Sequence, residues 1–275
     1  MIDLRLEMRR AGILCESEII CDGQIHRFKV DCSRKANGWY IFFRRGHETF
    51  GAFGDWKTGT RSTIGSRSVE IEEVLQKRKL DIDRRAAKAA KRASDEWARA
   101  EVIATSDHPY LARKRVGVFG VRACGGSLLI PMASGGSLVG LQTIRSDGTK
   151  RFTSGCKKAG ASHLIIGVGK RVVLCEGYAT AASIHMGTSL PVLVAFDCGN
   201  LLRAARAYTG DVEKWIVAAD NDQNTPGNPG LTKAREAANA LRGSLTVPSC
   251  SGTDFNDMHL ERGLEAVADE IYACL

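Results

Sequence analysis

The chain has 275 residues, 44% of them hydrophobic, and a formal net charge of +8. This length suffices for two or three domains with buried cores, and no run of about 18 apolar residues predicts a membrane-spanning helix. The charged start MIDLRLEMRR is not typical of a signal peptide. Nine scattered cysteines without a CxxC pair favour reduced thiols in the cytoplasm.

The charge is divided unevenly along the chain. Residues 1–168 carry 30 Lys and Arg against 18 Asp and Glu, a net of +12, whereas residues 169–275 carry 9 against 13, a net of −4. A basic front half joined to an acidic back half indicates that one part holds a polyanion and the other acts on it. The alternative is a soluble protein with a generally basic surface, and composition alone does not separate the two.

Residues 1–65 are predicted to form a small β-rich domain. The segments HRFKVDC, GWYIFFRR and ETFGAFGDW combine aromatic and β-branched residues, and turn signals such as Asn37-Gly38 accompany them. Aromatic faces interleaved with cations on a sheet can stack on and hold single-stranded bases, and Trp39 and Arg44 are candidates for this role. For most of these aromatics, packing in the core of the sheet is the alternative.

A zinc site is not expected in this domain. The four candidate ligands are Cys15, Cys21, His26 and Cys32. Their spacing fits no zinc-ribbon pattern, in which ligands come in closely spaced pairs.

Residues 66–105 are predicted to be a helical connector. Apolar residues recur at helical spacing from Ala86 to Ala100, and basic residues cover the other faces. The basic face indicates either contact with nucleic acid or, more commonly, a solvated charged surface.

Residues 106–168 are predicted to form a basic subdomain, of mixed α+β type, in which short strands alternate with glycine-containing turns. Cations recur around those turns, as expected of an element that grips phosphates of a nucleic acid strand or of incoming nucleotides. The candidates are Arg113, Lys114, Arg145, Lys150, Arg151, Lys157 and Lys158.

Residues 169–275 are predicted to be an α/β domain. We expect strands at 171–175, 192–196, 214–219 and 244–247, and helices at 178–187, 200–209, 230–242 and 262–273. Strands and helices that alternate in this way form a parallel sheet with right-handed crossovers and helices on its faces.

Carboxylates follow the strands of this domain. Glu176 comes after the first strand, Asp220 and Asp222 come after the third, and Asp254 and Asp257 come after the last. Ligands of open α/β sheets bind outside the carboxyl ends of the strands, so we expect these acids to converge. Acids this close repel one another unless a divalent cation, most naturally Mg²⁺, lies among them. The alternative is helix capping, above all for Asp254.

Several of these segments resemble a known family. CEGYATAAS, AADND and GTDFNDMH are similar to the Toprim domain of primases carried by plasmids, satellite phages and other mobile elements. HPYLARKRV, LLIPM and KRFTSG resemble the basic subdomain beside Toprim in bacterial replicative primases, and the likeness covers roughly residues 105–265. Two features depart from the family: Thr180 stands four residues after Glu176, where replicative primases usually have Asp, and the N-terminal segment lacks the spacing of a zinc ribbon. No helicase motif is recognisable either.

The resemblance implies a DNA primase that makes short RNA primers on single-stranded DNA from nucleoside triphosphates. In the family, the acids matching Glu176, Asp220 and Asp222 are catalytic and hold two or more Mg²⁺ or Mn²⁺ ions, and the later acidic motif maps to Asp254 and Asp257. Cations of the basic subdomain would neutralise the triphosphate or the template. A separately encoded replicative helicase would be the partner.

Two other functions use the same residues. A Toprim nuclease would direct water at a phosphodiester with these acids, although no further base is identifiable. A non-catalytic single-stranded-DNA-binding accessory protein would carry a silent Toprim fold, and the intact acidic motifs argue against this. A topoisomerase needs a nucleophilic tyrosine in a separate domain, for which the chain is too short.

Overall fold

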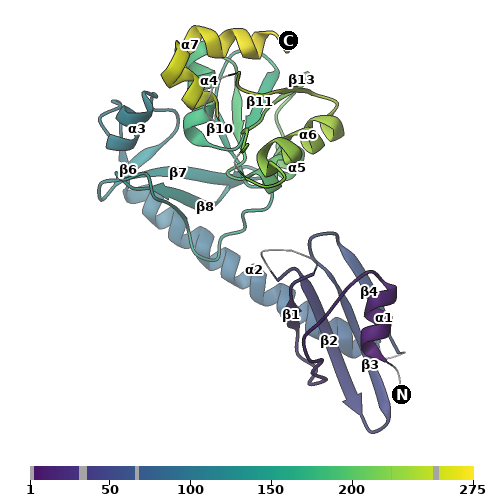
Figure 1. Ribbon diagram of the computed structural model, residues 1–275. Coiled ribbons are helices and arrows are strands. Elements are labelled where there is room, and N and C mark those ends of the chain that lie inside the picture. The colour runs from purple at the N-terminus through teal and green to yellow at the C-terminus, as the bar shows by residue number, and fades with distance from the viewer. Residues whose placement is uncertain (1–2, 31–35, 66–67, 224, 250–253) are drawn as a thin grey trace. The chain divides into compact units, whose positions relative to one another are not determined.

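The computed structural model describes residues 3–30, 36–65, 68–223, 225–249 and 254–275. The chain divides into two compact units, Met1–Asp83 and Arg84–Leu275, and the division falls within one long helix, α2 (Ser68–Arg99) (Figure 1). Among the described residues, no helix combines the length and the apolar character that crossing a membrane requires.

The N-terminal unit is a four-stranded antiparallel sheet with a core on each face. Its elements are α1 (Leu4–Arg10), β1 (His26–Phe28), β2 (Gly38–Arg45), β3 (Glu48–Asp55) and β4 (Thr60–Ile64), with the strands in the order β1-β2-β3-β4. Alternate residues of a strand point to opposite faces. Tyr40 and Phe42 therefore pack with Met8 of α1, while Trp39 and Ile41 pack with Ile71 of α2. Both faces are buried because both carry aromatic side chains.

The second unit begins with an antiparallel sheet in the order β5-β6-β7-β8-β9. Its elements are β5 (Glu101–Val102), α3 (Pro109–Lys114), β6 (Arg122–Cys124), β7 (Ser127–Ser134), β8 (Ser137–Ile144) and β9 (Lys150–Phe152). The β7–β8 hairpin turns through Gly135-Gly136, both at positive φ, which glycine adopts without steric cost. The carboxyl-terminal half of α2 packs on this sheet through Ala93 and Trp97.

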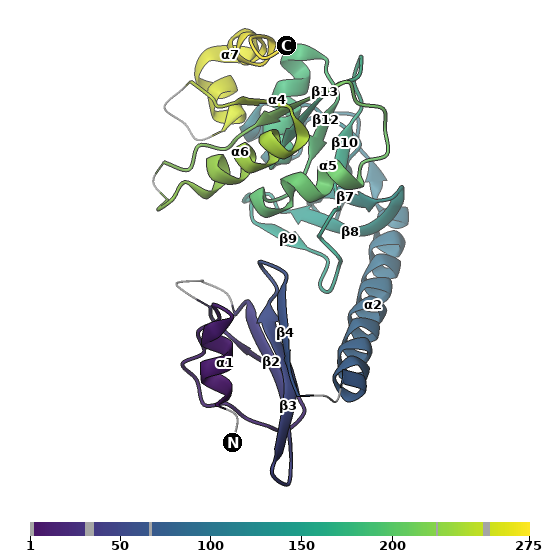
Figure 2. The same cartoon turned by 90° about the vertical axis from the view of Figure 1, so that its right-hand side faces the viewer.

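A five-stranded sheet in the order β10-β12-β11-β13-β14 forms the rest of this unit. Its elements are β10 (His163–Ile165), β11 (Arg171–Cys175), α4 (Tyr178–Thr188), β12 (Val192–Val194), the 3₁₀ helix η1 (Cys198–Asn200), α5 (Leu201–Ala207), β13 (Lys214–Ala218), α6 (Pro229–Leu241), β14 (Ser244–Thr246) and α7 (Phe255–Tyr272). The last four strands are parallel, and β10 is antiparallel at the edge. Helices α4 and α7 cover one face and α5 and α6 the other, so the predicted α/β fold class is confirmed (Figures 1 and 2).

One strand lies across a predicted domain boundary, and one predicted helix start was wrong. Residues 163–165, which we assigned to the basic subdomain, join the parallel sheet as β10. The last helix begins at Phe255 and not at residue 262, because Asp254 caps it and the backbone departs from helical angles only at Gly263 (φ 88°). The sequence prediction covered only the part of α7 around and beyond Gly263, and it missed the first two turns of the helix.

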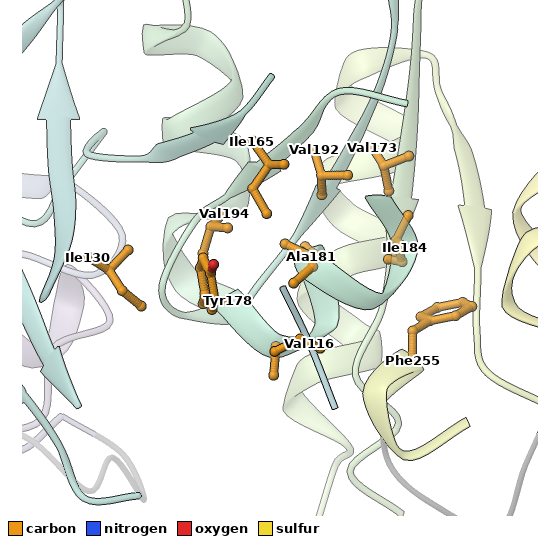
Figure 3. Close-up of a cluster of buried hydrophobic side chains, with 14 of the residues drawn as sticks. Val116, Ile130, Ile165, Val173, Tyr178, Ala181, Ile184, Val192, Val194 and Phe255 are labelled. Atoms are coloured by element: carbon orange, nitrogen blue, oxygen red, sulfur yellow. The ribbon is translucent and has the colours of Figure 1, made fainter. Parts of the chain in front are cut away.

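One hydrophobic core joins the two sheets of the second unit. Ile130 of β7, Val173 and Val194 of the parallel sheet, Tyr178 of α4 and Phe255 of α7 all belong to this core (Figure 3). Tyr178 also accepts a hydrogen bond from the Phe119 amide (2.9 Å) and donates one to the Gly117 carbonyl (3.0 Å). This packing fixes the basic subdomain against the carboxyl edge of the parallel sheet.

Candidate active site

Glu176 lies at the carboxyl end of β11, between the strand and α4. The amides of Ala195 and Phe196 donate to the carbonyls of Cys175 and Glu176, both at 2.8 Å, so the backbone pairing continues past the ends of β11 and β12. Phe196 then adopts φ 70°, a conformation that is unusual for a residue with a side chain. The turn brings its ring edge-on to Phe152, with centroids 6.1 Å apart, and so anchors β9 beside Glu176.

Asp220 and Asp222 lie in the loop that follows β13. A Cβ atom on Gly230, in the first turn of α6, would lie 2.5 Å from the Asp220 carbonyl oxygen and 3.0 Å from Asp222 Oδ2. Only glycine therefore allows the helix to begin this close to the loop. Asn228 ties the loop to the same helix start by donating to Asn221 Oδ1 at 2.8 Å.

Asp254 is the N-cap of α7, and its Oδ1 accepts from the amides of Asn256 (2.8 Å) and Asp257 (2.9 Å). The capping role considered from the sequence is thus real, but Asp254 also faces the other acids. Asp257 instead pairs with Lys114, Nζ to Oδ1 at 3.8 Å. The two acids of this motif therefore have different surroundings.

A cavity of about 160 Å³ lies where these elements meet. Acids of the parallel sheet form one side, and side chains of α3, β8 and β9 form the other. Its lining comprises Tyr110, Lys114, Gln142, Lys150, Glu176, Gly177, Ala179, Thr180, Phe196, Asp220 and Asp254. The structure thus brings together Glu176, Asp220 and Asp254 around the cavity, while Asp222 lies next to Glu176 outside its lining.

The crowded acids hold their protons more tightly than usual. Burial, and then the charges of Asp222 and Asp197, raise the pKa of Glu176 to about 7. Burial, and then the charges of Glu176 and Asp254, raise the pKa of Asp220 to about 8. Glu176 Oε1 and Asp220 Oδ1 are both buried without a hydrogen-bond partner in the described chain. Buried carboxylate oxygens are normally paired with a hydrogen-bond donor or a cation. Two such oxygens without a partner therefore indicate a site that lacks its ligand.

A divalent cation would supply the missing partner, and oxygen ligands are what Mg²⁺ prefers. Glu176 and Asp220 fit this role through their unpaired oxygens. Within the described residues, however, no three Asp, Glu, His or Cys side chains are grouped closely enough to hold an ion as they stand. The chemistry of these acids therefore suits a cation, but fewer than three of the described side chains lie close enough together to bind one directly.

Two of the seven predicted phosphate-binding cations, Lys114 and Lys150, line the cavity. Lys150 Nζ lies 6.0 Å from the centre of the Tyr110 ring. Lys150 is exposed on β9, but protein atoms near its ammonium and the charge of Lys114 lower its pKa. The charges of Asp254, Asp220 and Glu176 act in the opposite direction.

The remaining five cations lie away from the lining. Arg113 donates to the Ser146 carbonyl at 3.0 Å, and Lys158 lies 4.4 Å from the centre of the Phe152 ring. Arg145, Arg151 and Lys157 are exposed at the surface.

In the N-terminal unit, Trp39 is only 4% exposed and stacks on Trp56, so no face of Trp39 is available to a base. Arg44 is exposed on β2. Of the zinc candidates, His26 pairs with Asp22 at 2.9 Å, and Cys32 lies outside the described residues. No metal-binding group is found among the described Cys and His residues.

Three residues of the site were missed from the sequence. Asp197, directly after the predicted strand 192–196, carries the same signal as Glu176 and was overlooked. Gln142 is a polar residue in the strand SLVGLQTI, and it is only 5% exposed. A polar side chain in a largely apolar strand was the signal that could have indicated a functional role. Tyr110 gave no local signal, because an aromatic at a helix start is typical of core packing.

Comparison with known proteins agrees with this geometry. Residues 171–265 match the family model described as "Toprim domain". This part of the chain is a Toprim domain. Two DNA primase TraC proteins of Escherichia coli are 31% identical to the chain, over 88% and 83% of it. They confirm the resemblance to Toprim primases of the plasmid type. The chain spans about a fifth of the length of the first TraC protein (19%) and 24% of the second.

Solved structures of primases are also similar, at low sequence identity. The DnaG primase catalytic domain bound to single-stranded DNA aligns over 70% of this chain and 80% of that one, with 12% identity and a TM-score of 0.48. The primase of Aquifex aeolicus, with its zinc-binding and RNA polymerase domains, aligns over 89% and 80%, with 13% identity and a TM-score of 0.42. Scores below 0.5 do not establish a common fold by themselves.

Proposed function

We propose that this protein is a DNA primase, which joins ribonucleotides on a single-stranded DNA template during replication of a mobile element. The observation that carries the proposal is the cavity at the edge of the Toprim sheet. There, two buried carboxylate oxygens without partners among the described residues share a cavity with Lys114 of α3 and Lys150 of β9. An arrangement that holds cations beside phosphate-binding lysines suits phosphoryl transfer, in which positioning and charge stabilisation supply most of the catalysis.

Glu176, Asp220 and Asp222 would hold two divalent cations, Mg²⁺ or Mn²⁺, with Asp254 at the edge of the set. Bound cations stabilise the charge of the transferring phosphate and lower the pKa of an attacking 3′-hydroxyl. Because the pKa of Glu176 is about 7, this residue also has a proton to exchange near neutral pH. We rank that role below metal ligation.

Lys150 and Lys114 would bind the triphosphate of the incoming nucleotide. Lys150 reaches the cavity from β9, which Phe152 anchors against Phe196. Lys114 is held by Asp257, which explains why this second acid of the motif need not ligate metal. The exposed cations Arg145, Arg151, Lys157 and Lys158, together with Arg113, would then contact the template backbone, where exposure is required.

The N-terminal unit offers a second contact with the template. Trp56 is 37% exposed, and the guanidinium carbons of Arg78 and Arg27 lie 3.9 and 5.1 Å from the centre of its ring. Burial and then the charge of Arg27 lower the pKa of Arg78. A phosphate between the two guanidinium groups would relieve their repulsion. Arg44, exposed on β2, would extend this contact. We further propose a cytoplasmic location and a separately encoded helicase as partner.

Incubating the protein with single-stranded templates, labelled nucleotides and Mg²⁺ or Mn²⁺, and resolving the products on a gel, tests the proposal. Short template-dependent products that vanish with EDTA are expected. Supercoiled plasmid in a parallel reaction tests the nuclease alternative, since nicking without synthesis would replace the proposed activity. DNA binding that persists in EDTA, without synthesis or nicking, would favour the non-catalytic accessory protein.

A further inference from the structure

Tyr110 and Gln142 line the active-site cavity but have no part in the chemistry above. They come from α3 and β8, and they are 2% and 5% exposed. The Tyr110 hydroxyl is buried without a hydrogen-bond partner among the described residues. Gln142 places a neutral amide side chain in the same lining. A buried hydroxyl without a partner and a neutral amide thus lie in the lining of one cavity.

An unpaired buried hydroxyl opposes folding, and phenylalanine would fill the same space without that cost. Tyr178 provides a comparison, because its hydroxyl has a structural role in the same core. It belongs to the same hydrophobic cluster as Tyr110, and its oxygen is paired with the Phe119 amide and the Gly117 carbonyl. The Tyr110 hydroxyl has no such structural role, so its partner is expected to come from a ligand.

The cavity limits what that ligand can be. At about 160 Å³ it is smaller than the roughly 300–1,000 Å³ pockets that enclose whole drug-sized ligands, so it holds only part of a nucleotide. The charged triphosphate has its own partners in Lys114 and Lys150. A phenol and an amide suit a neutral group that both donates and accepts hydrogen bonds, and the sugar of a nucleotide carries such groups as hydroxyls.

We propose that Tyr110 and Gln142 bind the ribose hydroxyls of the incoming nucleoside triphosphate and thereby select ribonucleotides over deoxyribonucleotides. The inference rests on the proposed function. Its physical basis is that a deoxyribonucleotide would leave the buried Tyr110 hydroxyl unpaired, which a site built for a hydroxyl penalises strongly.

The test compares Tyr110→Phe with Tyr178→Phe, which removes an equivalent hydroxyl from the same core. We measure kcat/KM for ribo- and deoxyribonucleotides, and the Kd of non-hydrolysable analogues of both, together with the thermal midpoint. Tyr110→Phe should lower the ribo-to-deoxyribo ratio by roughly 10-fold or more without lowering the midpoint. Tyr178→Phe should lower the midpoint and leave the ratio unchanged. Gln142→Met, which nearly preserves volume, should act like Tyr110→Phe.

The outcomes separate this inference from the proposed function. If primers are made and Tyr110→Phe keeps the sugar preference of the wild type, the inference is wrong and the primase assignment stands. A wild type without sugar preference, or a variant that changes only the preferred base, also overturns it. A protein that neither joins nor binds nucleotides overturns the proposed function itself. If nucleotides bind but are not joined, the test of the inference is the ratio of the Kd values for the deoxyribo- and ribonucleotide analogues. This ratio should fall in Tyr110→Phe, and an unchanged ratio would contradict the inference.

Discussion

The N-terminal sheet and the carboxyl edge of the Toprim sheet are both rich in residues that suggest nucleic acid chemistry, but their polar groups have different surroundings. In the N-terminal sheet, Trp39 is buried against Trp56, so aromatic packing accounts for this candidate. At the Toprim edge, Glu176, Asp220 and Tyr110 each keep a buried oxygen without a partner in the described chain. Residue type alone therefore indicates function less reliably than a buried polar group that the fold leaves unsatisfied.

Asp220→Asn should have the largest effect, since it removes a charge needed for cations while preserving shape. We expect primer synthesis to fall by about 1,000-fold or more, as when charge stabilisation at a reacting centre is lost. The measurement is single-turnover incorporation on a primed template. Asp211→Asn, which removes an acid that pairs with Lys170 at 2.6 Å outside the cavity lining, is the matched control and should retain activity. Equal losses in both variants would contradict the site.

The acids also predict a pH dependence of stability without divalent metal. The pKa of Asp220 is raised from 3.8 to about 8 and that of Glu176 from 4.5 to about 7. Between those values the folded state holds protons that the unfolded state has released, so the free energy of unfolding falls as pH rises from about 4 to about 8. Thermal melts in EDTA should show a midpoint lower by several degrees at pH 8 than at pH 5.

Asp220→Asn should flatten this profile, because the amide does not titrate. Mg²⁺ should raise the midpoint of the wild type at pH 8 more than at pH 5, since a cation binds the ionised acids. A midpoint that rises steadily from pH 5 to pH 8 in EDTA would show that the acids are not crowded as the structure has them.

Lys150→Ala should raise the KM for nucleotides by roughly 10-fold while leaving metal affinity unchanged, because it removes one cation that binds phosphate. Lys157→Ala removes a lysine that is exposed outside the cavity, and it should leave the KM for nucleotides near that of the wild type. Steady-state kinetics and a metal titration distinguish the two. Lost metal affinity with an unchanged KM would contradict the assignment of Lys150.

Arg27→Gln in the N-terminal unit should have the smallest effect. It removes one guanidinium beside Trp56, so the affinity for single-stranded DNA should fall by a few fold at low salt. The slope of log K against log salt should become shallower by about 0.7 for each phosphate that the variant no longer neutralises. Primer synthesis at saturating template should not change. An unchanged slope would mean that this cation pair does not bind the template.

Local sequence patterns were enough to predict the parallel sheet and the placement of Glu176 and Asp220 at one edge of it. Apolar runs define the strands, and parallel strands end at a common edge, so neither prediction needs long-range information. Ordered motifs along the chain also carried the resemblance to Toprim primases. Nothing in the sequence distinguished Lys114 and Lys150 from the five other cations, because all seven occur in the same kind of basic, turn-rich segment.

Which side chains meet at the site became apparent only from the packing of whole elements. The shared core that includes Tyr178 fixes α3 and β8 against the Toprim edge, and Phe152 packs β9 on Phe196. Together these contacts bring Tyr110, Gln142 and Lys150 to the acids. The same packing brings Asp254 to the other acids and gives Asp257 a lysine partner. These interactions join residues that are tens of positions or more apart along the chain. Local periodicity carries no information about such pairings, because it reports only which face of one element is buried.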